Sequence, residues 1–124
     1  MLNFLRPRQG GAGAGQISGA DAVAEHSDGN LTIVDVRDQG EIVRTGKAKG
    51  ALHIPLSVLR FQSDPRNPDF HPELKIDKPV AIYCASGARS GIAARVMSQM
   101  GFSDVANLGN LNNWVAGGGE VVRN

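Results

Sequence analysis

Two runs of mostly apolar residues stand out because polar positions do not alternate through them. Residues 31–36 read Leu-Thr-Ile-Val-Asp-Val, and residues 79–84 read Pro-Val-Ala-Ile-Tyr-Cys. Each run has the length of a strand and contains β-branched residues, but neither has the strict in-and-out pattern of a half-exposed strand. The pattern therefore predicts strands of a mainly parallel sheet that is covered on both faces.

Shorter segments with strand or helix patterns surround these two runs. Brief strands are expected at residues 51–54, where Pro55 ends the run, and at residues 104–108. Ser18 is a candidate N-cap for the first helix. Strands that alternate with helices predict an α/β domain. The expected helices cover residues 18–25, 38–44, 57–61, 92–100 and 111–115.

Two segments show no apolar periodicity. Residues 1–15 are rich in glycine near their end and are expected to form a flexible segment before a single domain at residues 16–124. Residues 62–77 contain three prolines and are expected to form a long surface loop. No stretch approaches the roughly 18 apolar residues of a membrane span. The N-terminal apolar run is too short for a signal peptide, so a cytoplasmic location is expected.

Composition and charge narrow the classes of function. About a quarter of the residues are Leu, Ile, Val or Phe, above the roughly 20% below which disorder is expected. Thirteen basic and twelve acidic residues give a net charge of +1, which argues against a nucleic-acid or membrane partner. The single cysteine excludes an internal disulfide and a zinc site built from cysteines. The three histidines lack the paired spacing of metal ligands.

The single cysteine, Cys84, lies where a buried strand is expected to end and a turn leads into a helix. Ligands of open α/β sheets bind beyond the carboxyl ends of the strands. The unpaired N–H groups at the helix start and the charge of Arg89 would favour the thiolate, which is the nucleophilic form. The small residues 85–88 would let backbone N–H groups turn toward an anion. This context favours a reactive Cys84 over a buried packing residue, the usual alternative.

Four motifs occur along the chain in a characteristic order. Residues 84–90 read Cys84-Ala85-Ser86-Gly87-Ala88-Arg89-Ser90, which has the form C-x-x-G-x-R-S. Residues 34–37 read Val-Asp-Val-Arg, and residues 50–55 read Gly-Ala-Leu-His-Ile-Pro. Asn-Leu-Gly at residues 107–109 precedes a tryptophan and an Ala-Gly pair. Together the motifs span roughly residues 16–122, and through them the chain resembles the single-domain form of the rhodanese-like sulfurtransferase family.

The resemblance implies a five-stranded parallel sheet with helices on both faces and a sulfurtransferase activity. Cys84 would take a sulfane sulfur from a donor such as thiosulfate and become a persulfide. A cyanide, thiol or protein acceptor would then remove that sulfur in a ping-pong double displacement. No metal or organic cofactor is implied, and a monomer is favoured. The substrate-binding residues would be Ala85, Ser86, Gly87, Ala88, Arg89 and Ser90.

The chain departs from the family pattern at two places. Lys47-Ala48-Lys49 stands where the family often has His-Ile-Pro. These two cations would attract an anionic donor or, as the favoured alternative, form an exposed turn. Asn110 replaces a glycine, a change that would affect only a turn. Trp114, the only tryptophan, is expected in the core or as a lid on it.

Other functions remain open from the sequence. Phosphatases and arsenate reductases of this fold use Cys-x5-Arg, whereas four residues separate Cys84 from Arg89. The shorter loop suits one sulfur atom better than a tetrahedral phosphate. A sulfur carrier or partner-binding module would retain Cys84 without turnover. A cysteine hydrolase would need a histidine, for which His53 is the candidate, although a hydrogen-bonded structural histidine is favoured.

Two further residues near the predicted site have both a functional and a structural interpretation. Asp35 would orient loop amides or a basic side chain, with a salt bridge or helix start as the favoured role. Arg37 would pair with Asp38 or Glu41, or line the entrance for the donor. The loop at residues 62–70 could reach over the pocket, although a plain surface loop is favoured.

Overall fold

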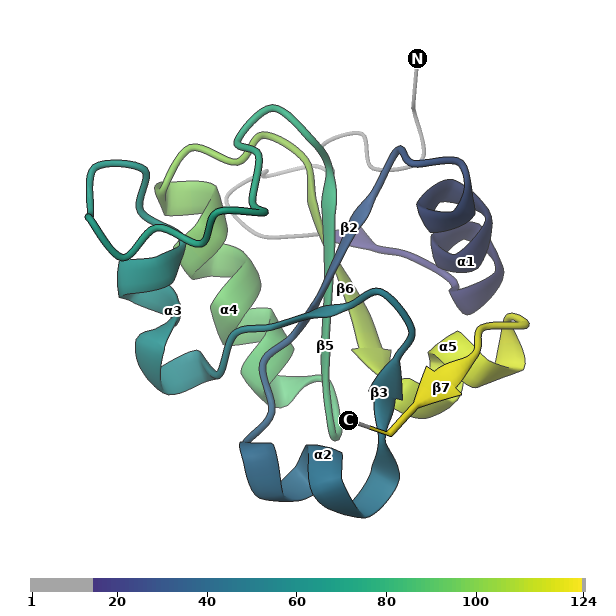
Figure 1. The fold of residues 1–124 in the computed structure, drawn as a ribbon. Coiled ribbons are helices and arrows are strands. Elements are labelled where there is room, and N and C mark those ends of the chain that lie inside the picture. Colours follow the sequence, from purple (N-terminus) through teal and green to yellow (C-terminus); the bar gives the residue numbers. More distant parts are fainter. Residues whose placement is uncertain (1–14, 124) are drawn as a thin grey trace.

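A five-stranded parallel sheet forms the centre of the protein in a computed structural model that describes residues 15–123 (Figure 1). Every pair of neighbouring strands is parallel, so all five carboxyl ends meet at one edge. The predicted α/β class and the five-stranded parallel sheet are therefore confirmed. The strands in spatial order are β1 (Gly15–Gln16), β6 (Val105–Asn110), β5 (Val80–Cys84), β2 (Thr32–Asp35) and β4 (Leu52–His53).

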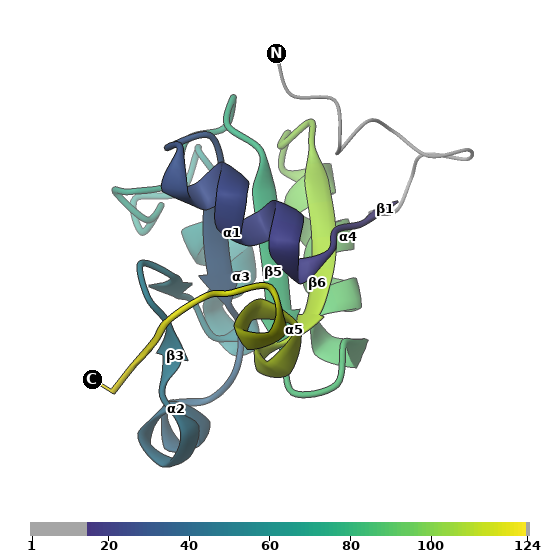
Figure 2. The ribbon, with the colours of Figure 1, turned by 90° about the vertical axis from the view of Figure 1, so that its right-hand side faces the viewer.

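Helices cover both faces of this sheet (Figures 1 and 2). Two of them, α1 (Gly19–Ser27) and α5 (Leu111–Ala116), pack together on one face. On the opposite face lie α3 (Leu56–Gln62) and α4 (Ala88–Gln99). The remaining helix, α2 (Gln39–Thr45), lies beyond the carboxyl edge, where Figure 1 shows it below the strands.

The sheet separates two layers of buried side chains. Ile82 and Val34 face α3 and α4, whereas their chain neighbours Tyr83 and Ile33 face α1 and α5. Successive side chains of a strand point to opposite faces, so both faces of β2 and β5 are buried. This double burial explains why neither run shows a clean alternation of polar and apolar residues.

Most helix boundaries follow local signals in the sequence. The Ser18 hydroxyl accepts a hydrogen bond from the backbone N–H of Asp21 at 3.1 Å and caps α1. At the start of α2, the backbone N–H of Asp38 donates to Glu41 at 2.9 Å. Helix α2 ends at Gly46, whose φ of 78° favours glycine. The predicted cap of α1 is therefore confirmed, and the helix runs two residues further than expected.

The start of α4 differs from the prediction. The helix begins at Ala88, whereas the apolar spacing predicted a start at Ile92. Its first turn consists of the small and polar residues 88–91, of which Ser90 contacts Cys84 at the end of β5, and such a turn has no apolar period. Ile92 itself is 47% exposed. The residues of α4 that are buried are Ser90, Ala93, Ala94 and Met97.

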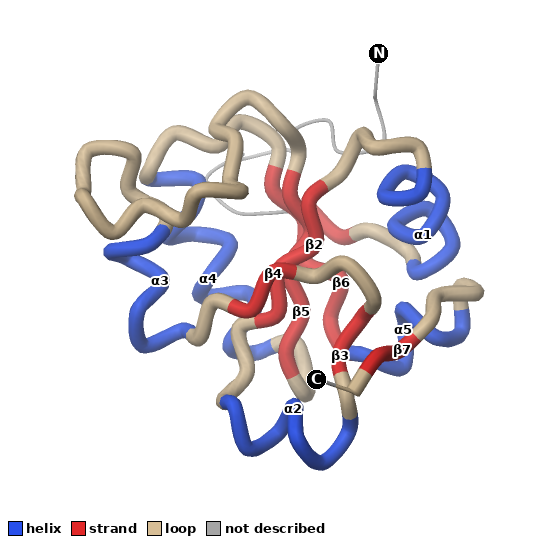
Figure 3. Tube along the Cα trace, in the orientation of Figure 1, coloured by secondary structure: helices blue, strands red, loops and turns tan. Residues whose placement is uncertain are grey.

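The long loop after α3 lies at the amino end of the sheet. Residues 63–79 contain no helix or strand, as predicted. Figures 1 and 3 show this loop at the top left, away from the edge where β5 ends. Ile76 lies against Gly101, which follows the C-terminal end of α4. The hypothesis that residues 62–70 reach over the pocket is therefore wrong, and the plain surface loop is confirmed.

Three strands of two residues each were not predicted. One is β1; the others are β3 (Lys47–Ala48) and β7 (Val121–Val122), which form a separate antiparallel pair beside α2 (Figure 1). Gly15, expected in the flexible segment, pairs with Ala106 of the sheet, and the rest of that segment lies outside the described residues. Between residues 15 and 123, no helix has the length and apolar character needed to span a membrane.

Candidate active site

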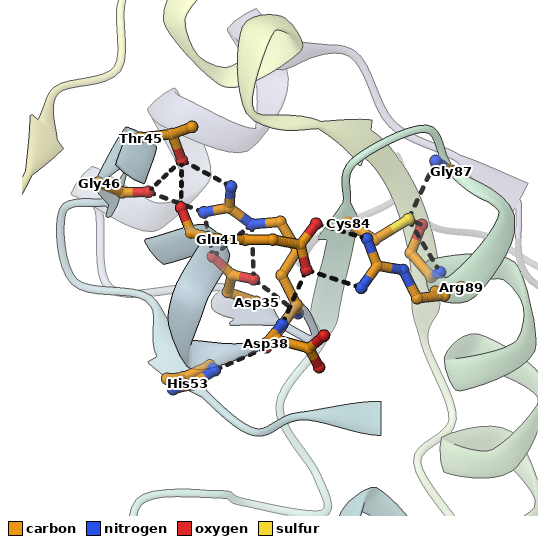
Figure 4. Close-up of polar contacts among 11 residues, drawn as sticks. Asp35, Asp38, Glu41, Thr45, Gly46, His53, Cys84, Gly87 and Arg89 are labelled. Atoms are coloured by element: carbon orange, nitrogen blue, oxygen red, sulfur yellow. Dashed lines mark hydrogen bonds and ion pairs between the residues drawn. The ribbon is translucent and has the colours of Figure 1, made fainter. Parts of the chain in front are cut away.

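Cys84 ends β5, and its sulfur faces the turn that leads into α4. The residue is 1% exposed. Its Sγ accepts hydrogen bonds from the backbone N–H of Gly87 at 3.0 Å and of Ser90 at 3.3 Å (Figure 4). The Ser90 hydroxyl oxygen lies 3.4 Å from the same sulfur. Three potential donors therefore converge on one sulfur atom.

The turn between β5 and α4 depends on Gly87. Its φ of 98° lies in the left-handed region, which only glycine adopts without strain. From there its carbonyl accepts from the N–H of Gly91 at 3.0 Å, the hydrogen-bond pattern of the first helical turn. Its own N–H points back at Cys84. Of the small residues 85–88, Gly87 therefore presents a backbone donor to the sulfur, and the role of the loop in binding a substrate stays a prediction.

The pKa of the Cys84 thiol reflects two opposing influences. Burial alone would raise this pKa, because it disfavours the charged thiolate. Hydrogen bonds from the Ser90 hydroxyl and from the backbone N–H groups of Ser90, Ser86 and Gly87 outweigh burial and lower the pKa below its ordinary value. The donors of the loop thus favour the nucleophilic form of the cysteine.

Arg89 is paired with an acidic residue that no sequence motif assigned to it. Its two terminal nitrogens each lie 2.8 Å from an oxygen of Glu41, in a bidentate ion pair (Figure 4). Hydrogen bonding to Arg89 lowers the pKa of Glu41 to about 2. The positive charge that the sequence placed beside Cys84 is therefore balanced by a carboxylate from α2.

Asp35 and Arg37 form a buried cluster beside this pair. Arg37 Nη2 lies 2.8 Å from Asp35 Oδ2 and 2.7 Å from the carbonyl oxygen of Gly46. Arg37 Nη1 donates to the Thr45 hydroxyl at 2.7 Å. The salt-bridge interpretation of Asp35 is confirmed. The hypotheses that Arg37 pairs with other acidic residues or lines an entrance are wrong, because its guanidinium is buried and bound to Asp35.

Asn107 of β6 binds two residues of the cysteine loop and one of its own strand, a role that the sequence did not reveal. Its Oδ1 accepts from the Ser90 hydroxyl at 2.7 Å and from the N–H of Gly109 at 2.9 Å. Its Nδ2 donates to the carbonyl of Gly87 at 3.1 Å. A bulge in β6, where the pairing with β5 shifts by one residue, falls at this point. The available signal was a polar residue inside an otherwise apolar strand.

A polar cavity of about 290 Å³ adjoins the loop on the side of β6 and α5. A larger cavity, about 570 Å³, lies at the amino end of the sheet near Asp28 and Lys78 and is remote from Cys84. The smaller cavity is the better candidate for a substrate site because the cysteine loop forms one wall. Its lining residues are Gln16, Ile17, Ser86, Gly87, Asn107, Leu108, Gly109, Asn110 and Asn113.

The remaining candidates have structural partners. His53 Nε2 lies 2.7 Å from the carbonyl oxygen of Arg37, which confirms the favoured hydrogen-bonded role. Trp114 is buried in the core as predicted, and its Nε1 donates to the backbone carbonyl of Glu120. Asn110 caps α5 by accepting from the N–H of Asn113 at 2.8 Å. Among residues 15–123, no three His, Cys, Asp or Glu side chains are grouped to hold a metal ion.

Two lysines near the two-stranded sheet of β3 and β7 also have partners. Lys49 forms an exposed ion pair with Glu120 at 3.2 Å. The Lys47 ammonium donates to the carbonyl of Ala51 at 2.9 Å. Lys47 and Ala48 thus form a strand, with Ala48 buried, where an exposed turn was expected, and the turn begins at Lys49. Attraction of an anionic donor stays a prediction.

Comparisons with curated proteins identify related chains. The uncharacterized protein YqhL of Bacillus subtilis is 34% identical over 90 residues, which are 72% of this chain and 62% of YqhL. The chain thus spans less than two thirds of YqhL. The thiosulfate:glutathione sulfurtransferase of Saccharomyces cerevisiae is 34% identical over 110 residues, covering 79% of this chain and 73% of the yeast protein.

A solved structure and a family model agree with these matches. The structure, from Rhodopseudomonas palustris, is described as a protein of unknown function and possible tyrosine phosphatase. It has a TM-score of 0.76 and 37% identity, covering 87% of this chain and 84% of the other. The model of the Rhodanese-like domain matches residues 18–116, which include the cysteine loop and every strand except β1 and β7. The chain therefore belongs to the Rhodanese-like domain family.

Proposed function

We propose that the protein is a sulfurtransferase that carries sulfur as a persulfide on Cys84. The observation that carries the proposal is the convergence of the Gly87 and Ser90 donors on a buried sulfur. Such donors stabilise negative charge on sulfur without a metal or a general base. Family membership and the name of the yeast relative support the same activity.

The proposed first step is an attack on thiosulfate. The Cys84 thiolate attacks the outer sulfur of thiosulfate, the S–S bond of thiosulfate breaks, and sulfite leaves with the electron pair. The negative charge then lies on the outer sulfur of the Cys84 persulfide. The backbone N–H groups of residues 85–89, at the start of α4, are the proposed donors to that outer sulfur.

The proposed second step returns the cysteine to its thiolate. A thiophilic acceptor attacks the outer sulfur, the persulfide S–S bond breaks, and Cys84 leaves as a thiolate that its loop donors stabilise. Cyanide is the simplest acceptor, and a glutathione-like thiol is the acceptor class suggested by the yeast relative's name. This double displacement predicts ping-pong kinetics. A sulfur-carrier role, without steady-state turnover, would use the first step alone.

A phosphatase is the second candidate, because the Rhodopseudomonas structure is described as a possible tyrosine phosphatase. The loop geometry favours sulfur. Four residues separate Cys84 from Arg89, and Arg89 is bound to Glu41 in a bidentate pair. A phosphate group would need that guanidinium as a ligand, so the ion pair would have to open first.

Intact mass measurement tests the proposal directly. Incubation with thiosulfate, followed by removal of excess donor, is expected to add about 32 Da, the mass of one sulfur atom, and cyanide is expected to remove it. Cys84→Ser is expected to prevent the gain and abolish thiocyanate formation while the protein stays folded. Turnover of thiocyanate would distinguish an enzyme from a carrier.

The opposite result would also be informative. Hydrolysis of p-nitrophenyl phosphate without any mass gain would support the phosphatase and contradict sulfur transfer. A mass gain that persists in Cys84→Ser would contradict the cysteine mechanism. Because the chain has one cysteine, any thiol-dependent gain reports on this site alone.

A further inference from the structure

The Ser90 hydroxyl has one proton and two neighbouring acceptors. Its oxygen lies 2.7 Å from Asn107 Oδ1 and 3.4 Å from Cys84 Sγ. A serine hydroxyl donates only one hydrogen bond at a time. Ser90 is fully buried, so bulk water does not compete for this proton. The choice of acceptor for the Ser90 hydroxyl therefore affects how well the site stabilises negative charge on the sulfur.

The amide of Asn107 is held in one orientation. Its Nδ2 donates to the carbonyl of Gly87 at 3.1 Å, and its Oδ1 accepts from the N–H of Gly109 at 2.9 Å. If the amide were flipped, its NH₂ group would face the N–H of Gly109, and its oxygen would face the carbonyl oxygen of Gly87, so both hydrogen bonds would be lost. The atom that faces Ser90 is thus the oxygen, which can only accept.

Two hydrogen-bond arrangements satisfy all of these groups. When Cys84 is a thiol, S–H donates to the Ser90 oxygen, and the Ser90 hydroxyl donates to Asn107 Oδ1. When Cys84 is a thiolate, the Ser90 hydroxyl donates to Sγ, and Oδ1 retains the N–H of Gly109. We propose that Asn107 is a positioning residue: its Oδ1 accepts a hydrogen bond from the Ser90 hydroxyl while the sulfur is neutral, and that hydroxyl turns to donate to Sγ when the sulfur becomes charged.

This inference rests on the proposed function where it concerns the persulfide. Transfer of the outer sulfur moves the negative charge away from Sγ, so the Ser90 hydroxyl turns back to Asn107. When an acceptor attacks, charge returns to Sγ as the leaving group, and the hydroxyl turns to it again. Asn107 thus lets one hydroxyl follow the charge through both steps, with no proton lost from the protein.

The charged groups around the sulfur are separate from this switch. Arg89 of α4 is paired with Glu41 of α2, and Asp38 precedes α2. Asp35 and Arg37, at the end of β2, are paired with each other. The other two elements beside the loop, β6 and α5, contain no ionisable residue. Substitutions at Asn107 and Ser90 therefore change hydrogen bonds without adding or removing a charge.

A double-mutant cycle on the thiolate pKa tests the proposal. Thiolate absorbance is titrated in the wild type, Ser90→Ala, Asn107→Ala and the double variant. The chain has one cysteine and one tyrosine, and burial together with the Asp35 charge raises the pKa of Tyr83, so the absorbance reports on Cys84. Ser90→Ala is expected to raise the pKa of Cys84, because the thiolate loses a donor.

The expected sign of the coupling between Ser90 and Asn107 follows from their hydrogen bond, because Asn107 and the sulfur compete for the same Ser90 hydroxyl. Asn107→Ala frees the Ser90 hydroxyl for the sulfur, but it also releases the Gly87 carbonyl, and only the first effect needs Ser90. The pKa change on Asn107→Ala should therefore be more negative in the wild-type background than in the Ser90→Ala background. The expected difference is about half a unit, the size of one modest hydrogen bond. Equal changes in the two backgrounds, or a difference of opposite sign, would overturn the proposal.

Asn113→Ala is the matched control. Asn113 lines the same cavity, and its side chain donates to the carbonyl of Leu108 at 2.8 Å rather than contacting Ser90. Its substitution is expected to have the same effect on the pKa in both backgrounds. The titration does not depend on sulfur transfer, so failure of this proposal and failure of the proposed function are distinguishable.

A measurement that leaves Asn107 intact covers the case in which its variants do not fold. The side-chain carbonyl ¹³C shift of Asn107 is followed by NMR as pH rises through the thiolate transition. It is expected to change at the same midpoint as the Cys84 absorbance, and the change should disappear in Ser90→Ala. The Asn113 carbonyl should stay constant. An Asn107 signal that does not respond in the wild type would overturn the proposal.

Discussion

Two arginines lie at the same edge of the sheet, and each binds a carboxylate, yet their surroundings differ. The side chains of Arg37 and Asp35 are 5% and 0% exposed, whereas those of Arg89 and Glu41 are 33% and 19% exposed. Figure 4 shows the two clusters side by side, with the cysteine next to Arg89. An arginine–carboxylate pair is therefore part of the buried core in one cluster and lies beside the candidate catalytic cysteine in the other.

The Arg37 cluster joins separate segments of the chain. Its guanidinium contacts the end of β2 through Asp35 and the end of α2 through Thr45 and Gly46. The guanidinium carbon also lies 5.4 Å from the centre of the Tyr83 ring in β5. Among the described residues, no buried side-chain nitrogen or oxygen lacks a partner. Such a cluster tolerates burial only because every charge and donor is paired.

The Arg89 pair is partly exposed to water, which screens its attraction. The pair therefore contributes little to folding, but the charge of Arg89 interacts with the nearby Cys84. Glu41 offsets that charge. Because the paired groups are alike, burial sets the expected effect on stability, and closeness to Cys84 sets the expected effect on reactivity.

The largest expected effect is the loss of one partner in the buried cluster. Asp35→Ala leaves the Arg37 guanidinium buried without its counter-ion, which is expected to lower the free energy of unfolding by about 3–5 kcal/mol. Denaturant unfolding at neutral pH measures this change. A loss below about 1 kcal/mol, the usual value for an exposed pair, would remove the distinction between the two clusters.

A paired substitution provides the control for this effect. Asp35→Leu combined with Arg37→Met removes both charges, so no unpaired charge remains in the core. The double variant is expected to be more stable than Asp35→Ala. If both variants were equally unstable, lost packing rather than the unpaired charge would explain the result.

A smaller effect is expected in the exposed pair. Glu41→Gln is expected to lower the free energy of unfolding by less than about 1 kcal/mol. The same change should lower the pKa of Cys84, because the Arg89 charge is no longer balanced. Thiolate absorbance titration measures the pKa, and Glu120→Gln, which breaks the exposed pair with Lys49, is the matched control that should leave it unchanged. A raised pKa in Glu41→Gln would contradict this electrostatic role.

The cysteine loop was predictable because its chemistry lies in consecutive residues. A strand end, small residues, a glycine and a helix start follow one another from Cys84 to Ser90, and each has a local physical meaning. Glu41 and Asn107 act on the same loop from 48 and 17 residues away, respectively, in hydrogen bonds to Arg89 and Ser90. A polar residue between apolar neighbours marks Asn107 as unusual, but no local pattern shows that Asn107 contacts Ser90 or that Glu41 contacts Arg89.

The elements of the fold divide in the same way. β2 and β5 were predicted because burial on both faces produces long apolar runs. β3 and β7 have two residues each and are too short to show a period. The first turn of α4 has no apolar period because its residues are small or polar, and its one buried side chain, Ser90, contacts the sulfur. Hydrophobic patterns thus predict the elements that form the core, and they are least informative for the segments that form the candidate active site.

The smallest expected effect is the acid titration of the Arg89–Glu41 pair. Hydrogen bonding to Arg89 holds the pKa of Glu41 below the roughly 4.3 of an unfolded chain, but water screens this partly exposed pair, so its contribution stays under about 1 kcal/mol. The unfolded state therefore binds the proton first as pH falls, so the stabilisation by this pair is complete above the unfolded pKa and is lost as pH falls through the lower pKa of the folded protein. Glu41→Gln lacks this group. The difference in free energy of unfolding between the wild type and Glu41→Gln, measured by denaturant at several pH values, is expected to be constant near neutrality and to shrink through the acid range. A difference that grew on acidification would show that Glu41 is easier to protonate in the folded protein, and the exposed pair would then not hold the carboxylate as its geometry indicates.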